Sequence, residues 1–389
     1  MKVAFITLNY PSIITGADTF AKNIVEELAE LGCQMTVFSL GRDGFEDVFI
    51  NDNLRVIKVP IIKNLPFFGL QYSLKLVKLI KKYHIKEKFD IIHFNGHIIL
   101  PFGKKLTDAP QIVTMHHSCL DAINQIKTNY SNRILNVSSE TGIIMPFIEK
   151  KLIESAQKIT VPSQFTKNSI LTNYQIDPSS VLVIKNGIKW DESKQTKKLE
   201  KNDDKFDTGK KTLLFVGTVD NSRKGVDILL RIFEKVIKEY DCQLLVVGSG
   251  NKDKAISLAK SLNINDNIYF TGYVDENTLN RYYNQCDIFV FPSRMEGFGI
   301  VILEANAVGK PVIAFNVGAA PELIKNYYNG ILIEDNDITS FANAILYLLK
   351  GGKLKFSKKE IISHAKKHTW KNSAKELYDL YNLMILEKE

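Results

Sequence analysis

The residues with the clearest chemistry lie between positions 287 and 311, where two glutamates flank a loop that contains glycines. An apolar run before the loop predicts a strand, and a helix is expected to open near Phe298 and to stop before Pro311. Gly297 and Gly299 let the backbone approach a ligand closely. Because the first N–H groups of a helix are unpaired and its dipole is positive at that end, the segment predicts a phosphate site.

The two glutamates are Glu296, which precedes the glycines, and Glu304, eight positions later on the expected helix. An ionised carboxylate accepts hydrogen bonds from two hydroxyl donors. An acid at each end therefore indicates recognition of hydroxyls on both sides of a diphosphate. The alternative is structural: Glu296 is an exposed loop acid, Glu304 is a solvated helix acid, and the glycines only form the turn.

The sequence of residues 296–305, EGFGIVILEA, resembles the E-x7-E block of retaining GT-B glycosyltransferases, in the large family that includes bacterial phosphatidylinositol mannosyltransferases and sucrose synthases. Seven further segments resemble motifs of that family in both halves of the chain. They are 16–18, 114–116, 184–188, 215–225, 245–250, 270–274 and 317–322. Thr218 departs from the pattern, because the family often has arginine at that position.

The resemblance implies transfer of a sugar from a nucleotide-sugar donor with retention of the anomeric configuration, without a metal ion or other cofactor. It assigns catalytic roles to His116, as a hydrogen-bond partner of the donor sugar near the reacting carbon, and to Glu296, as a contact of the sugar hydroxyls. The implied donor-binding residues hold the diphosphate, the ribose and the sugar. They are Gly16, Arg223, Lys224, Gly297, Phe298, Gly299, Ile300 and Glu304.

Several polar residues also allow a structural interpretation. His116 is either a donor-sugar contact or a structural histidine at a strand end, with His117 as the alternative contact. Lys224 is either a diphosphate ligand or a solvated residue at a helix start. His93 and His97 follow another strand, and they either line the acceptor site or pack against neighbours.

Two short motifs resemble sites that we do not predict. The acids at 335–337 imitate the metal-binding D-x-D of the other glycosyltransferase architecture, but their place in a loop favours a turn with helix-capping acids. The glycines at 248–250 lack the third glycine of the dinucleotide fingerprint, so NAD binding is not predicted.

Short β-branched or aromatic runs alternate with amphipathic stretches twice along the chain, which predicts two sets of βαβ units around parallel sheets. The expected strands are 2–7, 35–39, 54–60, 91–94, 112–115, 158–161, 181–184, 212–216, 243–247, 268–271, 288–291, 312–315 and 331–333. With the resemblance, the expected fold is α/β of the GT-B type: two Rossmann-like, doubly wound parallel-sheet domains that face each other across a cleft, with a C-terminal helix crossing back.

The domain boundaries follow from composition. Domains are expected at 1–190 and 212–370, and the resemblance implies that the first binds the acceptor and the second the nucleotide sugar. The segment 191–211 is charged and has little to bury, so it is expected to be a linker. Within 371–389, residues 372–386 carry apolar side chains at helical spacing, which predicts a last helix. With the resemblance, this helix is expected to pack back on the first domain.

The chain has 389 residues and a formal net charge of +8. Residues 54–105 hold eleven lysines or arginines against two acids, so the excess is local. Within it, residues 70–88 predict a helix that either solvates its lysines or contacts an anionic membrane surface, with the apolar residues 66–68 as a wedge. Nucleic acid binding is not predicted, because the basic stretch lacks aromatic residues interleaved with bases.

The N-terminus shows no signal-peptide design, and no apolar stretch approaches the length that spans a bilayer. The four cysteines lie far apart without a C-x-x-C pair, as is usual in a reducing compartment. We therefore expect a cytoplasmic protein, peripheral at the inner face of the cell membrane if the basic stretch binds there.

The resemblance thus implies a retaining, metal-independent hexosyltransferase. It would move a sugar from a UDP- or GDP-sugar to a lipid-linked or glycan acceptor in cell-surface polysaccharide or glycoconjugate biosynthesis. A sugar-nucleotide epimerase of the same two-domain architecture is the alternative, since it would bind similar donors and interconvert them without an acceptor.

Overall fold

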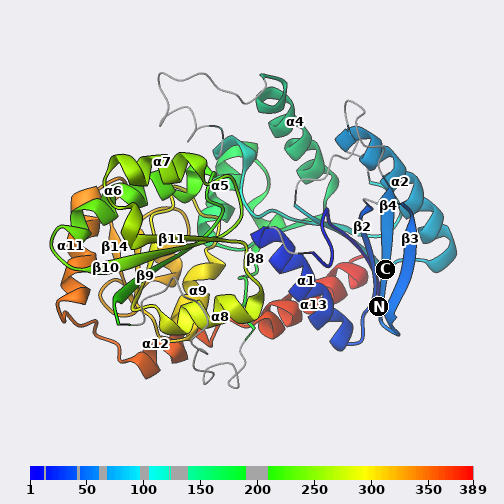
Figure 1. Ribbon diagram of the computed structural model, residues 1–389. Helices are drawn as coiled ribbons and strands as arrows, with labels where there is room; N and C mark the ends of the chain where they lie inside the picture. The colour runs from blue at the N-terminus through cyan, green and yellow to red at the C-terminus, as the bar shows by residue number, and fades with distance from the viewer. Residues whose placement is uncertain are drawn as a thin grey trace. The chain divides into compact units, whose positions relative to one another are not determined.

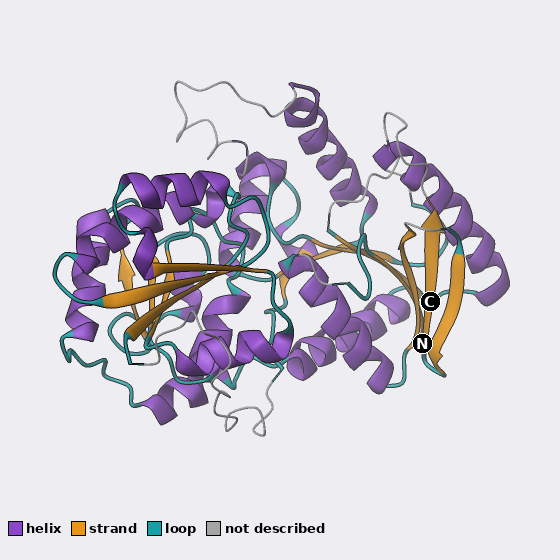
Figure 2. Ribbon diagram, viewed as in Figure 1, coloured by secondary structure: helices purple, strands orange, loops and turns teal. Residues whose placement is uncertain are grey.

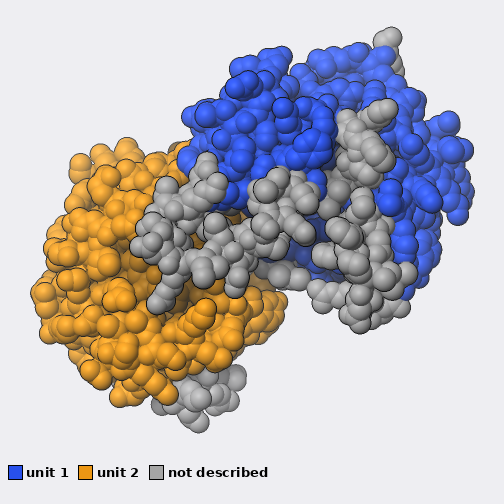
Figure 3. Space-filling model, turned by 90° about the horizontal axis from the view of Figure 1, so that it is seen from above, with its two compact units in different colours: residues 1–187, 370–389 blue, residues 188–369 orange. Residues whose placement is uncertain are grey.

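The computed structural model describes residues 1–12, 15–41, 44–60, 68–96, 105–121, 123, 139–189 and 209–388. Strands and helices alternate along most of the chain. Figure 1 labels many of these elements, and Figure 2 distinguishes strands from helices by colour. The chain forms two compact units, shown in different colours in Figure 3. Unit 1 comprises Met1–Gly187 and Trp370–Glu389, and unit 2 comprises Ile188–Thr369.

In the described part of unit 1, eight strands form one sheet in the order β3-β4-β2-β1-β5-β6-β7-β8. Their bounds are β1 (Lys2–Ile6), β2 (Gln34–Gly41), β3 (Glu46–Asn51), β4 (Leu54–Pro60), β5 (Ile91–Asn95), β6 (Gln111–Thr114), β7 (Lys158–Val161) and β8 (Val181–Val183). Neighbours pair in parallel, except that β3 runs antiparallel to β4. Strands β1 and β5 are almost wholly buried, because parallel sheets are covered on both faces.

Helices cover this sheet. They are α1 (Gly16–Glu30), α2 (Phe68–Glu87), α4 (Ser139–Ser155), α5 (Gln164–Tyr174) and α13 (Trp370–Leu386). The predicted C-terminal helix is α13, which begins two residues earlier than its apolar pattern and belongs to unit 1. Its Trp370 ring packs edge-on against Phe20 of α1, and its Tyr381 hydroxyl hydrogen-bonds His93 of β5.

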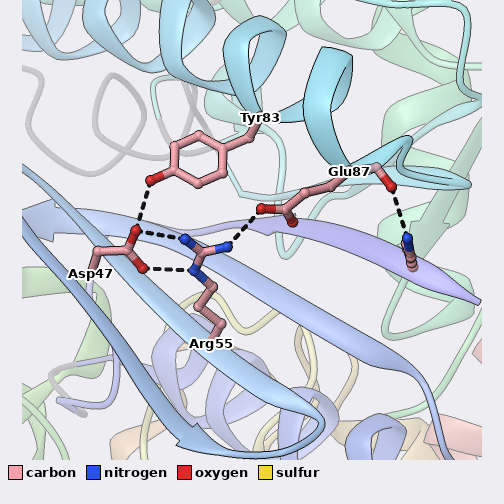
Figure 4. A network of polar contacts seen from close by, with 5 residues as sticks. Asp47, Arg55, Tyr83 and Glu87 are labelled. Atoms are coloured by element: carbon pink, nitrogen blue, oxygen red, sulfur yellow. Dashed lines mark hydrogen bonds and ion pairs between the residues drawn. The ribbon is translucent and has the colours of Figure 1, made fainter.

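Strand β3 is the one strand of unit 1's described part that the sequence did not predict. All six of its side chains are exposed, and its apolar residues Val48–Ile50 form a run of only three without the alternation that marks a half-buried strand. A polar network ties it to the rest of unit 1 (Figure 4). Arg55 makes a bidentate ion pair with Asp47 of β3 and a second pair with Glu87 of α2, and Tyr83 donates to Asp47. The guanidinium lowers the pKa of the Asp47 carboxyl.

In unit 2, six strands form a parallel sheet in the order β11-β10-β9-β12-β13-β14 within the described residues. The strands are β9 (Lys211–Val216), β10 (Cys242–Val247), β11 (Ile268–Gly272), β12 (Ile288–Phe291), β13 (Val312–Phe315) and β14 (Gly330–Ile333). The helices are α6 (Val226–Ile237), α7 (Asp253–Ser261), α8 (Glu276–Gln285), α9 (Ile300–Ala307), α10 (Ala320–Leu323), α11 (Ile338–Leu349) and α12 (Lys358–Ala365). Each unit is therefore a Rossmann-like α/β domain, as predicted.

Candidate functional site

In unit 2 the candidate residues follow β9 and β12, which are neighbours in the sheet. Because parallel neighbours end at the same edge, the loop after β9 meets the loop after β12. The backbone N–H of Arg294 donates to the carbonyl of Arg223 at 2.8 Å, and the Ser293 hydroxyl donates to the same oxygen at 3.0 Å. Gly225 has a φ of +71°, and a Cβ there would lie 2.0 Å from the Pro292 carbonyl oxygen. Only glycine fits this contact.

Glu296 and Lys224 form an ion pair across these loops. The Nζ of Lys224 lies 2.7 Å from the Glu296 carboxylate, and their side chains are only 23% and 17% exposed. The ammonium also lies 5.4 Å from the centre of the Phe291 ring. The sequence assigned Lys224 to the phosphates and Glu296 to the sugar without anticipating that the two would pair. Arg223, in the 3-10 turn Ser222–Lys224, is partly exposed beside them.

Helix α9 begins at Ile300, two residues later than expected, and Gly299 is its N-cap at a φ of +97°. No side-chain hydrogen bond caps this end among the described residues. The first N–H groups of α9 and its positive dipole end are thus suited to an anion. Phe298 is buried, and its ring joins the apolar cluster that includes Ile302, whereas Gly297 is partly exposed.

Glu304 lies on the second turn of α9 and is largely buried, with part of its surface exposed. The Tyr283 hydroxyl of α8 donates to its carboxylate at 2.8 Å. Burial raises the pKa of Glu304, and the hydrogen bond from Tyr283 opposes that shift. The eight-residue spacing therefore places one acid in the loop before α9 and the other on the helix itself.

The loop after β13 contacts the backbone of Glu296. Ala319 N–H donates to the Glu296 carbonyl oxygen at 3.0 Å. Gly318 has a φ of +58°, and a Cβ there would lie 2.2 Å from that oxygen. The sequence singled out 317–322 only as a family-like motif and did not predict this supporting contact.

The glycines at 248–250 lie at the carboxyl end of β10. A Cβ on Gly248 would lie 2.0 Å from the Gly217 carbonyl oxygen, and one on Gly250 would lie 2.3 Å from the Asp220 carboxylate. Their role is the close approach of two loops. Asp337 caps α11, where its carboxylate accepts from Ser340 N–H at 2.9 Å, as expected for a helix-capping acid.

Unit 1 carries Gly16 and His116. Gly16 is the exposed first residue of α1, and the preceding Thr15 is the N-cap in a capping box with Asp18. His116 follows β6 and is partly exposed; its Nε2 lies 2.8 Å from the Asn95 Oδ1. Its ring packs edge-on against Phe20 at a centroid distance of 5.1 Å.

The other histidines of this region differ in exposure. His93 is fully buried in β5, where it hydrogen-bonds Thr114 and Tyr381, so the packing interpretation holds. Burial lowers the pKa of His93 to about 3. His117 is partly exposed. His97 lies outside the described residues.

The basic helix α2 presents two faces. Tyr72, Leu76, Ile80 and His84 recur every fourth position and are buried. The other face exposes lysines at 78, 81, 82 and 86, together with Leu74 and Ile85. The expected apolar wedge at 66–68 lies outside the described side chains. In the part of the chain that the structure covers, no helix is long and apolar enough to cross a membrane.

Two family profiles match the chain, one over each half. Residues 14–192 match Glycosyltransferase Family 4, and residues 196–368 match Glycosyl transferases group 1. Among curated relatives, an uncharacterized glycosyltransferase of Methanocaldococcus jannaschii is 29% identical to this chain, and the alignment covers 99% of each protein. The phosphatidyl-myo-inositol mannosyltransferase of Mycobacterium leprae is 25% identical over 76% of this chain and 74% of that protein.

Solved structures share the fold of the whole chain. Sucrose-phosphate synthase from Thermosynechococcus elongatus superposes with a TM-score of 0.79 at 20% identity, covering 99% of each chain. HepE from Anabaena, in complex with UDP-glucose, superposes with a TM-score of 0.71 at 16% identity, covering 98% of this chain and 99% of HepE. At such identities the superpositions establish the two-domain fold.

Proposed function

The chain is a GT-B glycosyltransferase of the family 4 type, and on that premise we propose that it transfers a hexose, with retention of configuration, from a UDP- or GDP-sugar to a lipid-linked or glycan acceptor. The observation that carries this proposal is the Lys224–Glu296 pair beside the N-terminus of α9, which has no side-chain cap among the described residues. It combines a cation, a carboxylate and the N-terminus of a helix in one small region.

The proposed chemistry follows from the charges that develop. Breaking the anomeric bond builds positive charge on the sugar and negative charge on the departing diphosphate. Arg223, Lys224 and the N–H groups at the start of α9 would stabilise the diphosphate. As Lys224 turns towards the phosphates, the Glu296 carboxylate becomes available to accept hydrogen bonds from sugar hydroxyls.

The remaining residues complete the proposal. Glu304 would accept from the ribose hydroxyls beside its bond from Tyr283. Gly16 would offer a backbone N–H to the diphosphate, and His116 would hydrogen-bond the donor sugar near the reacting carbon. The scheme uses protein groups alone and assigns no step to a metal or other cofactor. The complex of HepE with UDP-glucose supports a nucleotide sugar as donor.

The test begins with a thermal-shift panel of nucleotides and nucleotide sugars, because a ligand that binds only the folded state raises the midpoint by mass action. The donor identified in this way is then used in transfer assays with Lys224→Ala and Glu296→Ala. We expect each variant to lose at least about a hundredfold in kcat. Lys238→Ala is the matched control, since its exposed pair with Glu234 has the same 2.7 Å length.

Transfer that is unchanged in both Lys224→Ala and Glu296→Ala would refute the proposal. The epimerase alternative is tested separately by incubating the protein with UDP-N-acetylglucosamine alone. A new sugar seen by NMR in the absence of acceptor would favour epimerisation over transfer.

We also propose that the exposed face of α2 contacts an anionic membrane, which would bring the protein to the inner face of the cell membrane and to a lipid-linked acceptor of cell-surface polysaccharide synthesis. The lysines at 78, 81, 82 and 86 surround the exposed Leu74 and Ile85. Each such lysine is worth about 1 kcal/mol near an anionic surface. We expect the protein to cosediment with anionic liposomes and not with neutral ones. The double variant Lys78→Glu and Lys82→Glu should no longer cosediment with anionic liposomes. Equal binding to both liposomes, or to neither, would exclude this contact.

A further inference from the structure

Asn95 links the two candidate residues of unit 1. It is the last residue of β5 and is only 4% exposed. Its Nδ2 donates to the carbonyl oxygen of Ala17 at 3.1 Å, in the first turn of α1 next to Gly16. Its Oδ1 lies 2.8 Å from the Nε2 of His116. One buried side chain therefore connects two elements that are a hundred positions apart in the sequence.

The sheet order explains this convergence. Strands β1, β5 and β6 are neighbours and run in parallel, so the residues at their carboxyl ends meet at one edge. Thr7 follows β1, Asn95 ends β5 and His116 follows β6. The Nδ2 of Asn95 also lies 3.2 Å from the Thr7 hydroxyl, so the amide is held from both sides.

The orientation of the Asn95 amide is fixed by chemistry. The Ala17 carbonyl oxygen can only accept a hydrogen bond, so it must face the NH2 group. The flipped amide would set the Asn95 oxygen against the Ala17 oxygen, and Asn95 is only 4% exposed, so little water could compensate. The Oδ1 therefore faces His116. Because an amide oxygen only accepts, the Nε2 of His116 must carry the proton.

We propose that Asn95 is a positioning residue: it holds His116 in the tautomer protonated at Nε2 and fixes the ring relative to the first turn of α1. In neutral His116 the lone pair then lies on Nδ1. Any substrate hydroxyl that donates to this ring must do so at Nδ1. The catalytic importance of this arrangement rests on the proposed function, whereas the tautomer itself does not.

The surroundings of the ring hold the same orientation. The edge-on contact with Phe20 restrains one side. Gly96 has a φ of +77°, and a Cβ there would lie 4.0 Å from the ring carbon Cδ2 of His116, so the backbone passes close to the ring. An aromatic contact limits the tilt of the ring without selecting a tautomer, and the hydrogen bond to Asn95 supplies that selection.

The test is NMR of the full-length protein labelled with 15N-histidine, in which His116→Gln assigns the His116 ring signals. At a pH where His116 is neutral, we expect a protonated-type shift at Nε2 and an unprotonated-type shift at Nδ1. Asn95→Ala removes the acceptor, so both shifts should move away from those of the tautomer protonated at Nε2. Asn95→Asp retains an acceptor and should retain the wild-type tautomer while losing the donor to Ala17.

The matched control is Asn23→Ala, which removes another buried asparagine of unit 1, whose amide donates to the Thr19 carbonyl on its own helix. It should leave both His116 shifts unchanged. Asn95→Leu, of similar volume, takes the place of Asn95→Ala if the alanine variant does not fold. A proton on Nδ1 in the wild type, or unchanged shifts in the variants that lack the acceptor, would overturn the proposal.

Transfer assays on the same preparations separate this proposal from the proposed function. We expect kcat to fall about 10- to 100-fold in Asn95→Ala, with a smaller change in the KM for the donor, because misplacement of a catalytic group by about 1 Å has effects of that size. A wild-type protein that shows the expected tautomer but transfers no sugar would contradict the proposed function alone. An unchanged kcat in a variant with altered tautomer would contradict the positioning role.

Discussion

The Lys224–Glu296 pair allows a quantitative prediction about stability. Replacement by Lys224→Met keeps most of the apolar stem and removes the charge, and Glu296→Gln keeps the size and removes the other charge. Each single variant leaves its partner in an environment where the side chain is less than a quarter exposed. The free energy of unfolding should therefore fall in both, and by less in the double variant than the sum of the two singles.

The structure sets the size of this coupling between two limits. Exposed ion pairs contribute about 0.2–1 kcal/mol, and breaking a fully buried pair costs about 3–5 kcal/mol. With side chains that are 23% and 17% exposed, the pair lies between these cases. We expect a coupling free energy of about 1–2 kcal/mol. The control pair Glu234–Lys238 is an i,i+4 pair on α6 and its flanking residue, with a lysine that is 67% exposed, so it should couple by only about 0.3–0.5 kcal/mol.

The assay is a double-mutant cycle from urea unfolding, read on the transition of unit 2, because two units need not unfold together. A coupling no larger than that of Glu234–Lys238 would refute the argument that the Lys224–Glu296 pair is both partly buried and energetically significant. A nucleoside diphosphate that binds as proposed should stabilise the wild type by about 2.7 kcal/mol at a hundred times its Kd. Lys224→Met should lose much of that gain at the same concentration.

Three further predictions follow from contacts within each unit. Gly318→Ala should lower the free energy of unfolding of unit 2 by at least about 1–3 kcal/mol in urea and should lower sugar transfer, because it combines a positive φ with a clash against Glu296. Gly351→Ala is the control: Gly351 has a φ of +96° and open space, so the loss should be smaller, and an equal loss would contradict the clash. Burial raises the pKa of Glu304 above its ordinary value. Its contribution to the free energy of unfolding should therefore be lost as pH rises from about 4.5 through the raised pKa. In Glu304→Gln, the free energy of unfolding should no longer fall with pH over that range. The pKa of His93 is lowered to about 3, so below about pH 6 the unfolded state binds a proton at this histidine that the folded state does not. The free energy of unfolding of unit 1 should therefore fall by about 1.4 kcal/mol per pH unit below about pH 6. A pH series that is unchanged in His93→Gln would contradict this.

The strands were predictable because parallel strands are buried on both faces. Segments such as Val3–Ile6 or Ile288–Phe291 carry no solvent-facing positions, so they appear in the sequence as short apolar runs between turns. Strand β3 has the opposite property, since its side chains are exposed on both faces. It is held by the ion pair of Asp47 with Arg55 and by the antiparallel ladder to β4, and the short, exposed apolar run Val48–Ile50 indicates neither contact.

The candidate site was only partly predictable for a related reason. The loop and helix around Gly297 are encoded locally, so spacing and glycines are enough to predict them. The pairing of Lys224 with Glu296 joins residues 72 positions apart, and it exists only because β9 and β12 are neighbours in the sheet. Asn95 was missed for the same reason, because its partners follow strands on either side of it.

Sheet order also explains why the candidate residues lie where they do in each unit. In unit 2, β9 is flanked by β10 on one side and β12 on the other, so the chain order reverses at β9. In unit 1 the corresponding reversal is at β1, between β2 and β5. Loops that leave adjacent strands at such a point diverge to opposite faces of the sheet and leave a crevice at its carboxyl edge. Lys224 and Glu296 come from the loops at the first reversal. Asn95 and its partners Thr7 and Ala17 lie at the second, and His116 follows the next strand, β6. A rearrangement that kept every motif but changed the strand order would separate both sets, so the topology of each sheet, more than any single motif, assembles its part of the site.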